Sequence, residues 1–581
     1  MSKLNIDQKT VKELFTRKKT NFLIPDYQRP YAWGNDECLT LWDDLFLFSF
    51  PDNDSSNFDS DNDEYFLGPI VTFKNDDGKM EIIDGQQRLT TLMLLLRAFY
   101  ETYGSMEGDK IEKVSKQIEQ CIWKTNEFGD ADKEELKIDS EVASDKHKEE
   151  FLNILKKGTV SDKEESRYAV NYRFFMEKIS KFKDSFPDFF SFFPIRIMNN
   201  CILLPIEAES QDTALRIFST LNDRGKPLSD ADIFKAQFYK HYSVKNEKET
   251  FIKRWKRLEE LCKSFTSSSG SALDEIFTRY MYYERAIQKN KKSTTEALRK
   301  FYEKNGYELL KKDETFDNLI DLAEFWKDIE FRNEDRFSDN VLKRLFVLDN
   351  APNGMWTYFV SVYYMANRDD EGLLDDEKFY HFLNKITAFI WAYAVTNPGV
   401  NALRGPVYAE MINIVYDKPV TFEGYLFDAE QVENAFNNYV FNNYRQITKS
   451  MLTWWAFQNP EQNLLELGSS IEIEHIYARN RQEIDHSLSN PKNIESLGNK
   501  SILEKSINIR ASDYSFEAKS KWYLGFKKNR NQKGEGTKIM ELRDLAETKT
   551  DFIESDIKER YARIISNFIG FMDNNGLISK K

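Results

Sequence analysis

Short runs of apolar, β-branched and aromatic residues alternate with polar turns near the start of the chain. Residues 65–73 and 80–83 have the pattern of strands, and Asn75-Asp-Asp-Gly78 between them is typical of a hairpin turn. Asn21-Phe-Leu-Ile-Pro25 is an earlier strand candidate that ends at a proline. The pattern therefore predicts a sheet in the first part of the chain.

Helical spacing of apolar residues surrounds these strands. Residues 1–20 are expected to contain a short helix, and residues 36–50 and 89–103 repeat apolar side chains at helical spacing. Asp84-Gly-Gln-Gln-Arg88 therefore falls at a strand-to-helix junction. The free backbone amides of a helix N-terminus favour an anion such as a phosphate.

The middle of the chain has a mainly helical pattern. Residues 110–193 are predicted to be charged helices with loops, and residues 271–460 to be long helices rich in aromatic residues. Cys201-Ile-Leu-Leu-Pro-Ile206 is a buried strand candidate, and Ser229-Asp-Ala-Asp232 fits a capping box that begins a helix. Thr266-Ser-Ser-Ser-Gly270 is expected to be a flexible joint.

Near the C-terminus, polar residues stand at positions that suit phosphodiester chemistry. Glu474 directly precedes His475 in a strand-like segment, and Asn499 and Asn508 follow. In a strand–strand–helix arrangement the histidine can deprotonate a water while a carboxylate and an amide oxygen hold a divalent cation on a phosphate. The alternative is a satisfied core histidine, which is the usual role of a lone histidine.

Composition limits the class of protein. At 581 residues the chain exceeds one ordinary core, so about three to four domains are expected. The chain has no run of about 18 apolar residues, so no transmembrane helix is expected. The first residues lack the apolar core of a signal peptide. The four cysteines are far apart, which favours buried thiols in the cytoplasm over a zinc site or a disulfide framework.

The net charge of −14 argues against nonspecific binding of nucleic acid, but the charge is unevenly distributed. Between Lys500 and Met540 there are ten Lys and Arg against four Asp and Glu. A basic patch directly after the histidine motif can hold phosphates. We prefer DNA contact by this patch, with Lys519 and Lys521 as contacts, over a solvated helix face.

Separated motifs, in the same order along the chain, resemble those of the GmrSD-type proteins. These are bacterial type IV, modification-dependent restriction enzymes. The resemblance covers both ends of the chain and leaves the helical middle unassigned. Its motifs are Ile24-Pro-Asp-Tyr-Gln-Arg-Pro-Tyr-Ala-Trp33, Phe66-Leu-Gly-Pro69, Asp84-Gly-Gln-Gln-Arg88, Leu221-Asn-Asp-Arg-Gly-Lys-Pro-Leu-Ser229 and the block from Glu474 to Asn508.

The resemblance implies an N-terminal ParB/sulfiredoxin-like domain that binds and hydrolyses a nucleoside triphosphate. Asp84 would hold magnesium or orient water, and Arg88 would grip a phosphate. The alternative is that Asp84 caps the following helix and pairs with Arg88. For Arg224, a simple turn and a phosphate contact are equally supported. No Walker A string occurs, so the nucleotide is not identified. The nucleotide-binding residues would be Gln28, Arg29, Gly85, Gln86, Gln87 and Arg224.

The C-terminal block resembles an HNH-type, ββα-metal nuclease. By this resemblance His475 is the general base, and Glu474 and Asn508 are ligands of one Mg²⁺ or Mn²⁺ ion. Asn499 would orient the histidine or hold the loop, and Lys519 would approach the phosphate.

The sequence thus predicts an α+β, multidomain, cytoplasmic defence enzyme without membrane contact. Residues 1–245 would bind nucleotide, with a helical insertion at about 105–195, residues 246–445 would be a helical connection, and residues 446–581 would form the nuclease with a helical tail. Nucleotide turnover would regulate cleavage of modified double-stranded phage DNA. Self-association into a homo-oligomer is left open.

The main alternative is a nucleotide-dependent, ParB-like DNA-binding regulator with a decayed nuclease domain. The acidic net charge favours it, as does Ala478, which stands where the family often has proline. A nuclease acting on RNA ranks third, because the sequence has no RRM or KH signature.

Overall fold

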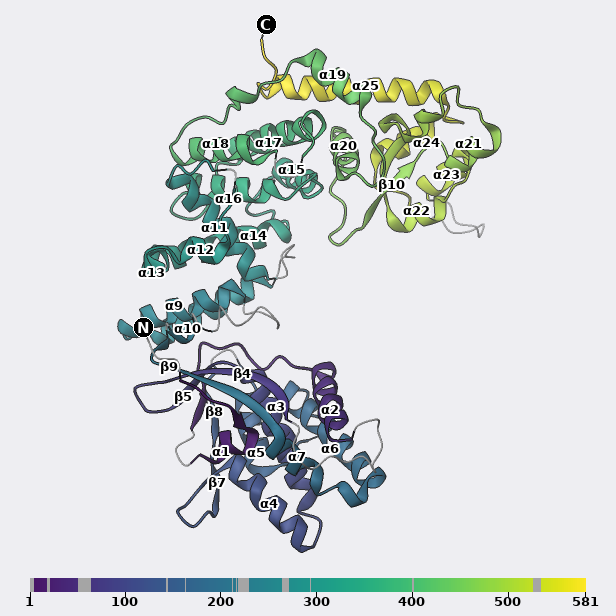
Figure 1. The fold of residues 1–581 in the computed structure, drawn as a ribbon. Coiled ribbons are helices and arrows are strands. Elements are labelled where there is room, and N and C mark those ends of the chain that lie inside the picture. The colour runs from purple at the N-terminus through teal and green to yellow at the C-terminus, as the bar shows by residue number, and fades with distance from the viewer. Residues whose placement is uncertain are drawn as a thin grey trace. The chain divides into compact units, whose positions relative to one another are not determined.

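The chain forms two compact units, Met1–Lys256 and Arg257–Lys581, in an α+β, multidomain fold as predicted (Figure 1). Across the described ranges, no helix combines the length and the apolar character that crossing a membrane requires. Arg224 and the predicted joint at 266–270 lie outside the described residues. The computed structural model describes residues 5–17, 21–50, 64–142, 145–161, 163–211, 213–215, 217, 229–263, 271–292, 294–399, 402–525 and 534–580.

The first unit is built on a mixed sheet with the strand order β1-β9-β4-β5-β3-β8, and β2 also pairs with β9. β4 runs parallel to β9 and antiparallel to β5, while β3 lies parallel to both β5 and β8. The strands are β1 (Asn5–Ile6), β2 (Lys9–Thr10), β3 (Phe22–Ile24), β4 (Tyr65–Lys74), β5 (Met80–Asp84), β8 (Ile138–Ser140) and β9 (Cys201–Ala208).

Helix α3 (Gln86–Tyr103) is the central helix of this unit. Its buried residues Leu92, Leu95 and Phe99 belong to a large apolar cluster, and it packs against α4 and α6. The other helices are α1 (Val11–Thr16), α2 (Asn35–Ser49), α4 (Asp109–Ile122), α5 (Lys148–Lys157), α6 (Arg167–Ser185), α7 (Phe192–Asn200), α9 (Asp230–Val244) and α10 (Lys248–Cys262), which contains the boundary between the units.

The predicted strands and helices around the junction of β5 and α3 are confirmed, and so is the capping box of Ser229 and Asp232. The segment 110–193 differs from its prediction, because it contains strands as well as helices. A small hairpin of β6 (Trp123–Thr125) and β7 (Ala131–Leu136) lies there, followed by β8. The charged residues 132–135 of β7 lack the alternation of apolar and polar positions that identifies a strand.

The second unit begins with packed helices, as predicted for the middle of the chain (Figure 1). Aromatic rings fill the spaces between them: Phe325 stacks on Tyr364 at 4.0 Å, and Phe389 on Phe422 at 3.7 Å. The helices are α11 (Ala272–Ile287), α12 (Leu298–Tyr302), α13 (Lys304–Tyr307), α14 (Asp313–Glu330), α15 (Asp339–Asp349), α16 (Met355–Asn367), α17 (Asp376–Thr396), α18 (Arg404–Val415), α19 (Ala429–Asn438) and α20 (Gln446–Ala456).

The same unit ends in a small hairpin surrounded by helices. β10 (Ile471–His475) pairs antiparallel with β11 (Lys500–Glu504), and α22 (Lys505–Ala511) follows immediately. This is the strand–strand–helix order predicted from the motif. The remaining helices are α21 (Arg479–Asp485), α23 (Phe516–Tyr523), α24 (Met540–Thr548) and α25 (Glu554–Asn574).

The predicted division of the chain at residue 245 lies eleven residues before the boundary between the units. The predicted division at residue 445 falls inside the second unit. It stays a prediction, because the helices and the hairpin belong to one compact unit.

Candidate functional site

The hairpin of β10 and β11 carries the predicted nuclease residues. In its register Glu474 lies opposite Ser501, and His475 lies opposite Lys500. Successive side chains of a strand point to opposite faces. Glu474 and His475 therefore leave the hairpin on opposite faces.

His475 lies in a nearly closed, positively charged environment. Its side chain is mostly buried, and Nε2 has no hydrogen-bond partner and lies 3.7 Å from Oε1 of Glu495. Burial, reinforced by the positive charges of Lys500 and Arg479, lowers the pKa of His475 to about 3. The imidazole is therefore neutral at pH 7, which is the form that a general base needs.

Glu495 connects the histidine to two cations. Its Oε2 accepts a hydrogen bond from Nζ of Lys500, and its Oε1 accepts one from Nη2 of Arg479, both at 2.5 Å. Lys500 is completely buried, whereas the Arg479 side chain is half exposed. One carboxylate between two cations leaves a net positive charge beside His475, which attracts a phosphate.

Glu495 and Arg479 belong to the site although no role was predicted for them. Both lie inside the block from Glu474 to Asn508, but no local pattern distinguishes them, and Glu495 lies 20 residues after His475 in the chain. Lys500 directly follows the predicted residue Asn499. An alignment of the two strands of the hairpin could have placed Lys500 opposite His475.

Asn499 holds the main chain that follows His475. It is completely buried; Oδ1 accepts a hydrogen bond from the backbone N–H of Tyr477 at 2.7 Å, and Nδ2 donates to the carbonyl oxygens of Tyr477 at 3.1 Å and Ile494 at 3.0 Å. Its own carbonyl oxygen accepts from the N–H of Ile476 at 2.8 Å. This is the geometry that a loop-holding residue requires.

Glu474 and Lys519 form a buried ion pair of 2.8 Å, in which both side chains are at most 5% exposed. The hydroxyl of Tyr523 donates to the same Oε1 of Glu474 at 2.6 Å. Burial raises the pKa of Glu474, while the Lys519 ammonium opposes that rise. The structure thus places Lys519 in the interior, away from the surface where a phosphate contact was predicted. Lys521 is exposed on the same helix and pairs with Glu517.

Asn508 lies on α22, where its Nδ2 donates to Oε2 of Glu472 at 2.9 Å. The two residues predicted to share a metal ion, Glu474 and Asn508, therefore have different partners. The oxygen donors of Glu472, Glu474 and Asn508 suit a hard divalent cation. An ion bound to Glu474 would have to take the place of the Lys519 ammonium. Within the ranges that the structure describes, no group of three or more His, Cys, Asp or Glu side chains is arranged so that it could hold a metal ion.

A second candidate site lies where β5 ends and α3 begins. Asp84 is the last residue of the strand, and Gly85 takes a φ of 93° as the residue that precedes the helix. A Cβ atom at Gly85 would also lie only 3.1 Å from Cγ1 of Ile70. Glycine is therefore required at this turn, at which a long helix begins.

Three glutamine side chains fasten the preceding segment to this junction. Nε2 of Gln28 donates to two carbonyl oxygens near the end of β5 at 3.1 and 3.3 Å. Nε2 of Gln86 donates to the carbonyl oxygen of Arg29 at 2.8 Å, and Oε1 of Gln87 accepts from the N–H of Ala32 at 2.6 Å. All three glutamines are buried, so these bonds give them a structural role.

Asp84, Arg88 and Arg29 are the charged side chains at this junction. Nη1 of Arg88 donates to the carbonyl oxygen of Pro69 at 3.0 Å, and the guanidinium lies directly against Gly68. Burial raises the pKa of Asp84, and the charges of Arg88 and Arg29 oppose that rise. Two guanidinium groups beside one carboxylate at a helix N-terminus can bind a phosphate.

Two family profiles match this chain and together include both candidate sites. The N-terminal domain of the GmrSD restriction endonuclease matches residues 11–239, and the C-terminal domain of the GmrSD restriction endonucleases matches residues 427–566. A search of curated proteins found no match. The chain therefore belongs to the GmrSD restriction endonuclease family.

Proposed function

We propose that this restriction endonuclease cleaves modified double-stranded DNA, in particular phage DNA, at the β10–β11 hairpin. A nucleoside triphosphate, bound and hydrolysed at the β5–α3 junction, regulates the cleavage. The observation that carries the proposal is the buried, neutral His475 beside a cationic cluster, inside a domain of a restriction endonuclease family.

His475 accepts the proton of the attacking water. In the free protein, burial and the neighbouring cations Lys500 and Arg479 disfavour the protonated imidazole. A bound phosphodiester brings a negative charge that offsets Arg479 and Lys500, so the pKa of His475 rises toward the range in which a base is most effective. Arg479 is the half-exposed cation of the cluster and contacts the phosphate.

Mg²⁺ or Mn²⁺ would be held by Glu474 and Asn508, with Glu472 beside them, once the ion replaces the Lys519 ammonium at Glu474. Because Glu474 and His475 leave the hairpin on opposite faces, the phosphate would have to lie at the end of β10 to meet both the ion and the imidazole. There the ion would supply stabilisation of the charge that develops on the phosphate oxygens. Asn499 keeps the main chain between His475 and Tyr477 in place.

In the first unit, Arg88 and Arg29 bind phosphate groups and Asp84 orients the hydrolytic water. The turn at Gly85 opens the helix N-terminus to the nucleotide. Because a ligand shifts a conformational equilibrium only through its different affinity for the two states, nucleotide and product must favour different states of the enzyme.

The alternative is a nucleotide-dependent DNA-binding regulator that does not cut. Ala478 supports it, since the family often has proline there. However, Ala478 is buried and directly precedes α21, so the local backbone is packed without a proline ring.

The test compares unmodified plasmid with phage DNA that contains glucosylated cytosine, with Mg²⁺ or Mn²⁺ and with or without nucleotides. We expect wild type to cut the modified DNA, His475→Ala to hydrolyse nucleotide without cutting, and Arg88→Ala to lose hydrolysis. His147→Ala, at an exposed histidine, is the matched control and keeps both activities. Loss of both activities in His475→Ala alone would contradict separate sites, and nucleotide-dependent DNA binding without cutting by wild type would favour the regulator.

A further inference from the structure

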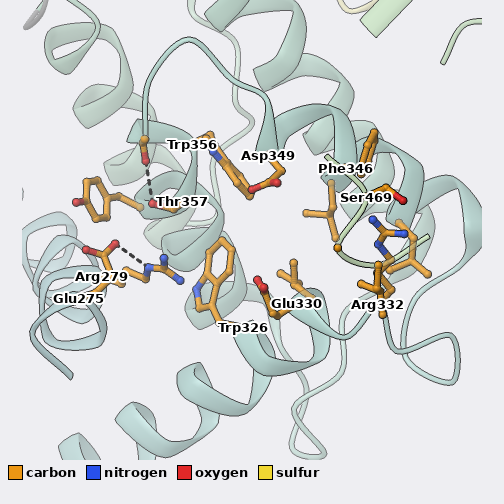
Figure 2. A pocket seen from close by; sticks show the side chains of 17 residues that line it. Glu275, Arg279, Trp326, Glu330, Arg332, Phe346, Asp349, Trp356, Thr357 and Ser469 are labelled. Atoms are coloured by element: carbon orange, nitrogen blue, oxygen red, sulfur yellow. Dashed lines mark hydrogen bonds and ion pairs between the residues drawn. The ribbon is translucent and has the colours of Figure 1, made fainter. Parts of the chain in front are cut away.

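A cavity of about 630 Å³ lies within the second unit, outside both candidate sites (Figure 2). Helices α11, α14, α15 and α16 form its walls, and the loop Leu467–Ser469 forms part of its rim. Its volume is in the range of pockets that enclose small organic groups. The cavity is therefore large enough for one nucleoside.

Aromatic rings that contact each other and carboxylates line this cavity. Trp326 and Trp356 meet edge to face at 5.6 Å. Figure 2 shows Trp326 and Glu330 on one side of the cavity and Trp356 and Asp349 on the other. Indole rings stack on flat ligands, and carboxylates accept hydrogen bonds from amino groups such as the N4 amino group of cytosine.

A buried ion pair forms another part of the wall. Glu275 and Arg279 lie 3.1 Å apart with side chains only 6% and 7% exposed, and the guanidinium of Arg279 lies 4.0 Å from the centre of the Trp326 ring. Removing such a pair from water costs free energy and adds little stability. A charged pair in a cavity wall is therefore more consistent with ligand recognition than with stabilisation.

The charges of the lining exclude several classes of ligand. Three carboxylates, Glu275, Glu330 and Asp349, outnumber the two guanidinium groups of Arg279 and Arg332, which disfavours a phosphate. The guanidinium groups disfavour a cation, and five ionisable side chains disfavour an apolar molecule. A neutral, flat ring with several polar groups remains, and a nucleobase has this chemistry.

We propose that this cavity receives one nucleobase that is turned out of the DNA duplex. This inference rests on the proposed DNA cleavage. An extruded base is recognised by stacking and by hydrogen bonds to its polar edge, as the indoles and carboxylates of the cavity provide. The rim residue Ser469 lies two residues before β10, and Arg332 donates to the carbonyl oxygen of Leu465, two residues before the loop Leu467–Ser469. The base therefore contacts the loop that leads to His475.

The test uses duplexes of about 20 base pairs, either fully paired or with one central mismatch, and measures their affinity by fluorescence anisotropy. Because a mismatched base costs less to extrude, wild type should bind the mismatched duplex more tightly, by about tenfold. The double variant Glu330→Gln/Asp349→Asn should lose this preference. Glu334→Gln, an exposed carboxylate four residues from Glu330 and outside the cavity, should keep it. An equal preference in wild type and the double variant would overturn the proposal.

Deoxycytidine and deoxyadenosine provide a second measurement that needs no cleavage. Saturable shifts of indole resonances in wild type, absent from the double variant, support the cavity as a base site. Unchanged binding in the variant, or none in wild type, argues against it. A wild type that binds free deoxynucleosides but neither binds nor cuts any duplex would contradict the proposed function and the extrusion of a base from DNA, while the cavity itself would remain a nucleoside site.

Discussion

The Nζ atom of Lys519 donates hydrogen bonds both to Oε1 of Glu474, at 2.8 Å, and to the carbonyl oxygen of His475, at 2.6 Å. One buried ammonium thus fixes the carboxylate and the main chain of the adjacent histidine together. The divalent ion of the proposed function would compete with this ammonium for the same oxygen. Under that proposal, Lys519 would link the stability of the hairpin to the binding of metal.

Lys519→Met should destabilise the protein and increase its response to metal. The substitution leaves the buried Glu474 carboxylate without its counter-ion, which costs about 3–5 kcal/mol. Because a cation can then replace the ammonium, Mn²⁺ should raise the melting temperature of the variant more than that of wild type. Calorimetry with and without Mn²⁺ measures both effects. Lys521→Met, on the exposed face of the same helix, should change the stability by no more than about 0.5 kcal/mol.

Asn499→Ala should abolish cleavage through the main chain rather than through loss of a reacting group. Three side-chain hydrogen bonds disappear in a completely buried site, at a cost of about 2–4 kcal/mol. Amide hydrogen exchange should become faster at Tyr477, whose N–H loses its acceptor. Asn567→Ala is the control, because that exposed side chain donates to the carbonyl oxygen of Arg563 in its own helix. Unchanged exchange at Tyr477 with lost activity would instead indicate direct participation of Asn499.

Local patterns predicted the elements that carry both sites, and they failed for contacts between distant residues. Asp84 and Gly85 could be placed at a strand-to-helix turn, because alternating apolar residues precede them and a helical stripe follows. The pairing of Glu474 with Lys519, 45 residues later, has no local signal. The same holds for Glu495, whose place beside His475 depends on the turns between β10 and β11. The resemblance to HNH nucleases implied that Asn508 shares a metal ion with Glu474, whereas the structure places its amide beside Glu472.

Gly68→Ala should weaken nucleotide binding in the first unit. Gly68 has a φ of 118°, and a Cβ atom there would lie 2.9 Å from Nη2 of Arg88. The methyl group would displace the guanidinium that we propose binds phosphate, so we expect at least a roughly tenfold loss of affinity in calorimetric titration with nucleotide. Gly108→Ala is a matched control for backbone strain, because its φ is 135° and no atom lies within 4 Å of the added Cβ. Equal losses in both variants would show that strain, not displacement of Arg88, causes the effect.

The pH dependence of cleavage should show how Arg479 acts on His475. The pKa of His475 lies at about 3, well below its ordinary value of 6.5, so the base stays unprotonated as the pH falls through 6.5. The kcat/KM of wild type, which reports the free enzyme, should therefore not decline with a midpoint near pH 6.5. Arg479→Gln removes a positive charge that holds this pKa down, so its acid limb should move to higher pH.

The measurement is the rate of plasmid nicking at sub-saturating DNA between about pH 2.5 and pH 8, at constant ionic strength, so that the range includes the acid midpoint expected for wild type. Arg543→Gln is the control, because this arginine is not among the groups that lower the pKa of His475. If Arg479 only bound the phosphate, its substitution would lower kcat/KM equally at every pH and leave the midpoint unchanged. A midpoint that moves upward in Arg479→Gln alone would assign to this arginine the electrostatic control of the base.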